Sequence, residues 1–100
     1  MGMNVQIASS GTLTNGTWLI ISIISITGTS AAGQAYVWIG DNSIVYAARK
    51  SESQTYLGTG QGYVATVSYV GTGTGPFLAV GQANGSTATG AAIIYCTRLA

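Results

Sequence analysis

The amino-acid sequence predicts an all-β fold, and three observations support this. Glycine accounts for 15 of the 100 residues and, with Asn-Gly and Asp-Asn steps, interrupts the chain too often for helices of ordinary length. Between these breaks lie short runs rich in Val, Ile, Thr, Tyr and Trp, which suit a pleated sheet. Several of the runs alternate in side-chain type with the two-residue period of a strand. These features predict a single domain of antiparallel strands.

The expected strands are bounded by turns that contain glycine, asparagine or proline. In chain order they span residues 4–8, 12–14, 17–27, 34–39, 43–48, 54–57, 62–70, 77–83 and 91–98. The connection Gly40-Asp41-Asn42 is short, so strands 34–39 and 43–48 are expected to pair as an antiparallel hairpin. The Gly-Thr-rich segment at 71–75 is expected to be a flexible loop.

The strand at 17–27 is apolar on both of its faces. One face carries Leu19, Ile21 and Ile23, and the other carries Trp18, Ile20, Ile24 and Ile26. A solvated sheet face does not require such residues, so we expect one face to pack inside a sandwich and the other against another subunit. Only 5% of the residues are charged and the net charge is +1, which gives little repulsion between copies and favours permanent association.

The sequence has few residues suited to catalysis or metal binding. It contains no His, one Cys (Cys96), and two carboxylates, Asp41 and Glu52, that are separated in sequence. Acid–base and nucleophilic mechanisms need paired groups, and metal sites need clustered ligands. We therefore expect no enzyme activity, no catalytic residues, no metal site and no cofactor. Cys96 lies in an apolar strand and is expected to act as a small hydrophobic residue.

The charge pattern also narrows the choice of partners. Three basic residues against two acidic ones provide no basic stripe for nucleic acid. The main apolar run, 18–26, is shorter than the roughly 20 residues of a membrane helix. We expect neither a nucleic-acid nor a membrane partner. The first residues lack the basic and apolar regions of a signal peptide, so ordinary secretion is not expected.

Three segments share a layout with a known class of proteins. They are Gly16-Thr17-Trp18-Leu19-Ile20-Ile21, then Ala35-Tyr36-Val37-Trp38-Ile39 with a polar turn and Ile44-Val45, and finally Thr89-Gly90-Ala91-Ala92-Ile93-Ile94-Tyr95. In this order they resemble the small trimeric jelly rolls of the tumour-necrosis-factor-like class, as found in bacteriophage capsid decoration proteins and at tail-fibre tips. The resemblance implies an antiparallel jelly-roll β-sandwich, a homotrimer around a threefold axis, and no catalytic residues.

The function expected from this resemblance is that of a virion structural protein. The protein would be a capsid decoration, or cement, protein that binds the major capsid protein on the capsid surface as a trimer, after assembly in the host cytoplasm. The alternative is a receptor-binding or carbohydrate-binding tip domain of a tail fibre. Residues 12–100 are expected to form the jelly roll. Residues 1–11 are expected to form an arm and hinge, in which 4–8 pair with a neighbour's open sheet edge.

Eight residues are candidates for the interface with other subunits or with the capsid. They are Val5, Ile7, Trp18, Ile20, Tyr36, Trp38, Arg49 and Lys50. The aromatic residues among them could stack on sugars, but their strand spacing favours packing in the core or at a subunit interface. Arg49 and Lys50, beside Glu52, are expected either to form a solvated turn or to bind an acidic capsid surface or a neighbouring subunit.

Overall fold

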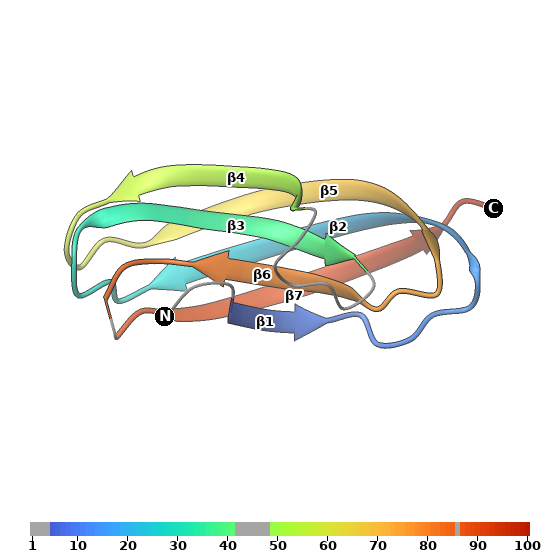
Figure 1. Cartoon of the computed structure of the whole chain (residues 1–100), viewed down its shortest axis with the longest axis horizontal. Coiled ribbons are helices and arrows are strands. Elements are labelled where there is room, and N and C mark those ends of the chain that lie inside the picture. Colours follow the sequence, from blue (N-terminus) through green and yellow to red (C-terminus); the bar gives the residue numbers. More distant parts are fainter. Residues whose placement is uncertain (1–4, 42–48, 86) are drawn as a thin grey trace.

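The computed structural model of the chain describes residues 5–41, 49–85 and 87–100, and this part is all-β (Figure 1). In chain order the strands are β1 (Val5–Ser9), β2 (Gly16–Thr27), β3 (Gly33–Asp41), β4 (Lys50–Leu57), β5 (Tyr63–Gly73), β6 (Phe77–Gln82) and β7 (Thr89–Arg98). The predicted fold class is confirmed. No helix in these ranges is long and apolar enough to cross a membrane.

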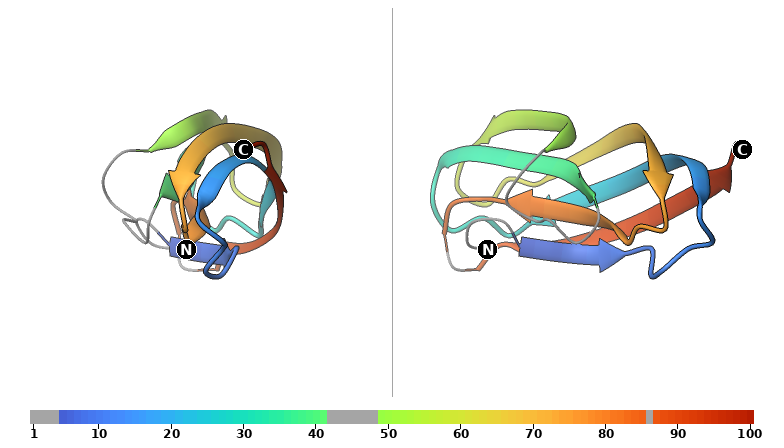
Figure 2. Two further views of the ribbon diagram at one scale, coloured as in Figure 1. Left: turned by 90° about the vertical axis from the view of Figure 1, so that its right-hand side faces the viewer. Right: turned by 45° about the vertical axis from the view of Figure 1, so that its right-hand side comes forward.

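The strands form two antiparallel sheets that pack face to face. One sheet has the order β1-β6-β3-β4 and the other has the order β5-β2-β7. Every connection except that between β3 and β4 passes from one sheet to the other. The end-on view shows the two layers surrounding a common interior (Figure 2). Along the two long sides of the sandwich, β1 approaches β7 and β4 approaches β5.

The core lies between the inner faces of the two sheets. From β2 it receives Ile20, Ile24 and Ile26, which are fully buried, and from the facing sheet it receives the side chains at alternate positions of β3 and β6. Phe77 lies in this core, and its ring meets that of Tyr69 edge-on, with centroids 6.4 Å apart. As expected from the two-residue period of a strand, every second side chain of each central strand points into the interior.

A second apolar cluster lies on the opposite, outer side of the four-stranded sheet. Trp38, Leu78 and Val80 are buried there, with Tyr36 packed against them. The guanidinium carbon of Arg49 lies 4.1 Å from the centroid of the Trp38 ring and 5.3 Å from that of Tyr36. These distances are those of cation–π contacts, which add to the apolar packing of this cluster.

Two strand predictions differ from the structure, and a third lies outside the described residues. Residues 12–14 do not form a strand; instead the Leu13 N–H donates to the Thr74 carbonyl (2.7 Å). The expected loop at 71–75 begins as strand, because β5 continues to Gly73 in register with β2. Gly71 is needed there, since a Cβ atom would come within 2.6 Å of the Phe77 ring. The strand and hairpin expected at 43–48 lie outside the described residues, and β4 and β6 occupy the two edges of β3.

The prediction of a separate N-terminal arm is wrong for the described residues 5–11. β1 pairs with β6 of its own chain, with Val5 opposite Gly81 and Ser9 opposite Leu78. Ile7 and Ala8 pack against the main core. Because β1 forms one edge of the four-stranded sheet, residues 5–9 belong to the sandwich and do not form a separate arm.

Candidate self-association surface

The outer face of the three-stranded sheet is apolar and lies open to solvent. We define this outer face by the side chains that point away from the core: Thr17, Leu19, Ile21, Ile23, Ser25 and Thr27 of β2; Val64, Thr66, Ser68 and Val70 of β5; and Ala91, Ile93, Tyr95 and Thr97 of β7. The continuous register of β2 with both neighbours sets them in rows, so that Thr66, Ile23 and Ile93 lie side by side across the middle.

The large apolar side chains of the outer face are exposed to an unusual degree. Five of them are exposed, from 39% for Ile23 to 66% for Val64, with Val70, Ile93 and Tyr95 between 53% and 55%, whereas Leu19 and Ile21 are half-buried. None of the side chains that define the outer face is charged. A contiguous exposed apolar area of this kind is typical of a surface that another molecule covers.

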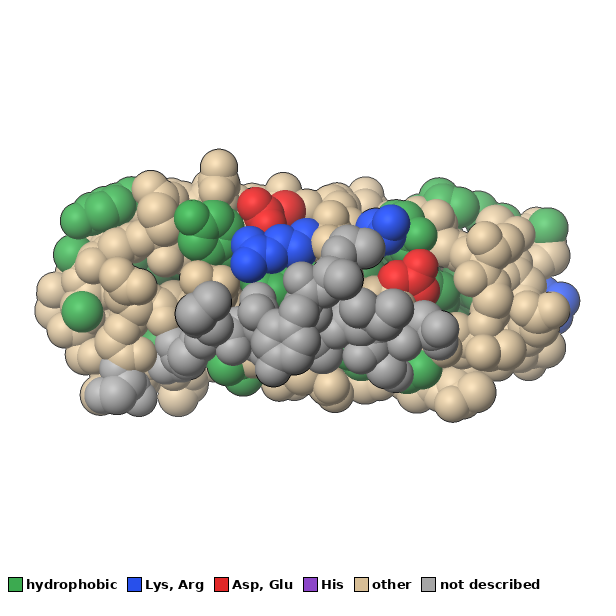
Figure 3. Space-filling view, viewed as in Figure 1, with side chains coloured by type: hydrophobic (Ala, Val, Ile, Leu, Met, Phe, Trp, Pro, Cys, Tyr) green, Lys and Arg blue, Asp and Glu red, His purple; other side chains and the backbone are tan. Residues whose placement is uncertain are grey.

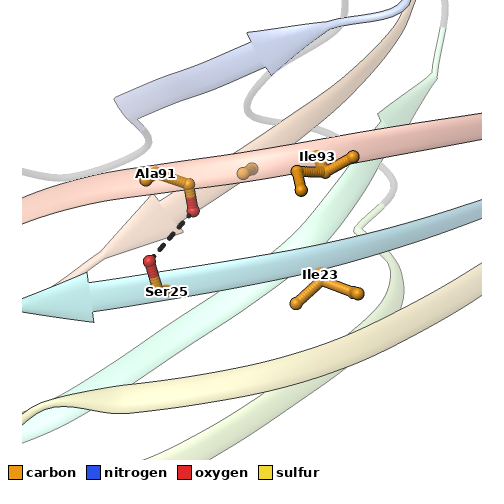
Figure 4. A pocket seen from close by; sticks show the side chains of 5 residues that line it. Ile23, Ser25, Ala91 and Ile93 are labelled. Atoms are coloured by element: carbon orange, nitrogen blue, oxygen red, sulfur yellow. Dashed lines mark hydrogen bonds between the residues drawn. The ribbon is translucent and has the colours of Figure 1, made fainter.

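A shallow hollow lies within the outer face, between β2 and β7. It measures about 190 Å³ and is lined by Ile23, Ser25, Ala91, Ala92 and Ile93. Figure 4 shows Ile23 and Ile93 on the neighbouring strands, with Ser25 and Ala91 one row further along. The Ser25 hydroxyl donates to the Ala91 carbonyl (3.3 Å), which satisfies the serine without a partner molecule. The hollow is therefore shaped by small residues beside large ones, and it fits an apolar side chain better than a polar ligand.

Four of the five charged side chains lie elsewhere, near the ends of β3 and β4. Acidic and basic side chains gather on the face of the four-stranded sheet (Figure 3). The Arg49 guanidinium donates to the Glu52 carboxylate (2.9 Å), and the Tyr69 hydroxyl donates to the Asp41 carboxylate (3.0 Å). The ammonium nitrogen of Lys50 lies 5.5 Å from the centroid of the Tyr69 ring. The chain thus places most of its charge away from its exposed apolar surface.

The contact between Tyr69 and Asp41 predicts a pH dependence of stability. Burial, followed by the hydrogen bond to Asp41 and the negative charge of Asp41, raises the pKa of Tyr69 above its ordinary value of about 10. The neutral phenol is favoured in the folded protein, so this contribution to stability is complete below pH ~10 and is lost as the pH rises through the raised pKa.

The test compares the wild-type protein with Tyr69→Phe by urea unfolding between about pH 8 and pH 11. The loss of unfolding free energy with rising pH should be smaller in Tyr69→Phe, because this variant lacks the phenol whose pKa is raised. The other five tyrosines are common to both proteins and contribute equally to the two curves. Parallel curves for the two proteins across this range would contradict the prediction.

Of the eight predicted interface residues, the structure brings Tyr36, Trp38 and Arg49 together in the second cluster, but it does not gather all eight on one surface. Ile20 and Trp38 are fully buried, in the main core and in the second cluster respectively, so the prediction that they line an interface is wrong. Trp18 and Ile7 pack partly against the main core, and the Trp18 indole N–H donates to the Thr14 carbonyl (3.0 Å).

The remaining predicted residues keep some access to solvent. Val5 is 36% exposed on the edge strand β1, and Tyr36 is partly buried in the second cluster. Arg49 is exposed and Lys50 is partly exposed. The expected solvated turn is wrong for Lys50 and Glu52, because both belong to strand β4. A contact of Arg49 and Lys50 with a partner stays a prediction.

The sequence shows that β2 has two apolar faces, but the interface candidates taken from this strand, Trp18 and Ile20, lie on the face that points to the core. The outward residues are Leu19, Ile21 and Ile23, and the aromatic face with Trp18 is the inner one. The two serines of the strand could not have shown which face points inward, because each face carries one of them. Ser22 is fully buried and its hydroxyl donates to the Ile93 carbonyl (3.0 Å), whereas Ser25 is partly exposed on the outer face.

Cys96 lies on the inner side of β7 and packs against the main core as a free thiol. Burial raises its pKa, so the thiol form is favoured over the reactive thiolate. Within the residues that the structure describes, no group of three or more His, Cys, Asp or Glu side chains is placed to hold a metal ion.

Comparison of the sequence with models of known families and with curated proteins, and of the structure with solved structures, found no significant match. The outer face and the distribution of charge are therefore the features that bear on function.

Proposed function

We propose that this protein is a non-enzymatic structural protein of a phage virion, a capsid decoration protein that binds the outer capsid as a homotrimer. The observation that supports this most is the uncharged outer face of β5-β2-β7, set apart from the charged side chains near β3 and β4. This separation of apolar and charged surfaces suits a protein whose apolar face contacts other copies of the same chain, while its charged face meets solvent or a larger partner.

The size of the outer face fits a contact between subunits. Strand spacing and rise give a flat area of roughly 500 Å² for three strands of ten residues, and the side chains that project from it add further surface. This is the same order as the ~800 Å² that each partner contributes to a standard interface. The resemblance to trimeric jelly rolls supplies the threefold symmetry, since strand faces from three subunits meet along the axis in that class.

The connectivity of the strands supports the jelly-roll part of the proposal. The chain passes between the two sheets at nearly every connection, as in double-sheet jelly rolls, and a simple meander would keep consecutive strands in one sheet. A structural role also agrees with the carboxylates, which are both engaged: Glu52 with Arg49, and Asp41 with Tyr69.

The test has two parts, oligomeric state and partner. Sedimentation equilibrium should give the mass of a trimer, and the trimer should bind expanded, empty capsids of the phage that encodes it. Binding should depend weakly on salt, because apolar contact and backbone hydrogen bonds are expected to dominate over charge. A glycan array provides the opposing measurement. Binding to cell-surface sugars and not to capsids would reject the decoration role in favour of a tail-fibre tip.

A further inference from the structure

The strand β7 forms an open edge of the three-stranded sheet. It pairs with β2 along its whole length, from Thr89 to Arg98, without a register shift. Among the described residues no strand pairs with its other side, because β7 stands last in the order β5-β2-β7. A long edge strand presents a row of unpaired backbone groups on which another strand can pair.

The backbone groups on the open side belong to alternate residues of β7. The Ser22 and Ser25 hydroxyls of β2 donate to the carbonyls of Ile93 (3.0 Å) and Ala91 (3.3 Å), and the Leu99 N–H donates to the Thr17 carbonyl (2.7 Å). The odd-numbered residues therefore direct their backbone groups toward β2. In an antiparallel ladder the alternate residues direct theirs away, so the open side is formed by residues 90, 92, 94, 96 and 98.

The other edge strands are protected in ways that β7 is not. β4 carries Lys50 and Glu52, and β1 is five residues long with a bulge in its pairing. On β5 the Ser68 N–H donates to the Ser51 hydroxyl (3.1 Å), so β4 occupies part of that edge. Charges, bulges, short length and covering are the usual devices that keep edge strands from pairing. β7 has no charge before Arg98, no proline and no bulge. β1 approaches β7 across the side of the sandwich, but among the described residues it makes no backbone hydrogen bond with β7.

We propose that β7 pairs antiparallel with β7 of a second copy across a twofold axis, which joins the two three-stranded sheets into one continuous sheet. The incoming strand must be uncharged and apolar on both faces along its middle, because Ile93 and Tyr95 flank the edge outside, and Ile94 and Cys96 flank it inside. Among the described strands, β2, β3 and β6 have both edges occupied, and β1, β4 and β5 are protected. β7 itself meets the requirement, and a twofold contact lets the same strand serve both copies.

The register follows from the open-side residues and from the one charge on the strand. Centring the pair on Ile94 sets Ala92 opposite Cys96 of the partner subunit, and Gly90 opposite Arg98 of the partner subunit. This register uses nearly the full strand. It places each Arg98 beside a residue without a side chain, and it keeps the two guanidinium groups about 27 Å apart along the strand, well beyond the ~8 Å screening length of physiological salt.

This contact rests on the self-association in the proposed function, but it uses the edge of the sheet and not its outer face. The threefold contact through the outer face builds a trimer, and the twofold contact through β7 links one trimer to the next. Together they give a connected layer, which is what a protein that reinforces a shell requires.

The test is a disulfide formed by the full chain carrying Ala92→Cys. Within one chain, positions 92 and 96 lie about 13 Å apart on the strand, too far for a disulfide. In the proposed pair, position 92 faces Cys96 of the partner subunit with Cα atoms about 5.5 Å apart, within disulfide reach. Mild oxidation should therefore convert most chains of Ala92→Cys to dimers on non-reducing electrophoresis, and reduction should reverse this.

Matched variants separate this contact from random oxidation and from the trimer. Ala91→Cys places the new thiol on the opposite face of β7, and the double variant Ala92→Cys/Cys96→Ser lacks the acceptor thiol, so neither should cross-link above the wild-type level. Adding Ile23→Asp to Ala92→Cys should abolish the trimer and leave the cross-link, so failure of the trimer can be told from failure of the edge contact. Absence of a cross-link in Ala92→Cys, or equal cross-linking in Ala91→Cys, would overturn the proposal.

Discussion

Substitution of Ile23 by Asp is expected to convert the proposed trimer into a folded monomer. Ile23 lies in the middle row of the outer face, between Thr66 and Ile93, so a carboxylate there would be buried in an apolar contact without a partner. The penalty for burying an unpaired ion is several kcal/mol, and each 1.4 kcal/mol changes an equilibrium constant tenfold. We expect the concentration at which the trimer dissociates to rise by at least ~1,000-fold.

Sedimentation velocity over a dilution series measures this change, and circular dichroism checks the fold. Because Ile23 is 39% exposed in the single chain, the monomer should remain folded, with a stability loss on the order of the ~1 kcal/mol range of strand propensities. Thr59→Asp is the matched control, since it adds the same charge in an exposed turn away from the outer face. An unchanged trimer in Ile23→Asp would show that subunits meet through another surface.

Replacement of Trp38 by Ala is expected to cause the largest loss of stability. Trp38 is fully buried between Leu78, Val80 and Tyr36, and Arg49 lies over its ring. Truncation of a buried Trp or Phe costs ~3–5 kcal/mol, a large fraction of the ~5–15 kcal/mol that stabilises a domain of this size. Loss of the cation–π contact with Arg49 adds to this cost.

Urea unfolding of the two proteins at equal concentration measures the difference. Tyr56→Ala serves as the control because Tyr56 is an aromatic strand residue that is 63% exposed, and its truncation should change stability by only about 0.5 kcal/mol. If Trp38→Ala kept the wild-type stability but lost partner binding, Trp38 would belong to a binding site and not to the interior.

The local pattern of the sequence was sufficient for the fold class and for most of the strands. Long apolar runs rich in β-branched residues, bounded by glycines, predict strands. β2, β3, β5 and β7 were located on this basis. Residues 12–14 were misassigned because alternation over three residues is too short to distinguish a strand from a connection that packs one side chain, Leu13, on the core. Pairing of Gly71–Gly73 with β2 depends on a strand more than 40 positions earlier in the chain, which local composition does not reveal.

The sequence by itself determined that β2 is apolar on both sides, that charge is scarce, and that the residues for most catalytic chemistries are missing. These properties depend on composition and on the two-residue period of a strand, which are local. Tertiary structure alone decided which face of β2 points inward, that β1 belongs to its own sheet, and that β7 is left as an open edge. The physical reason is that a strand has two equivalent faces and two equivalent edges, and only the pairing and stacking of distant segments makes them different.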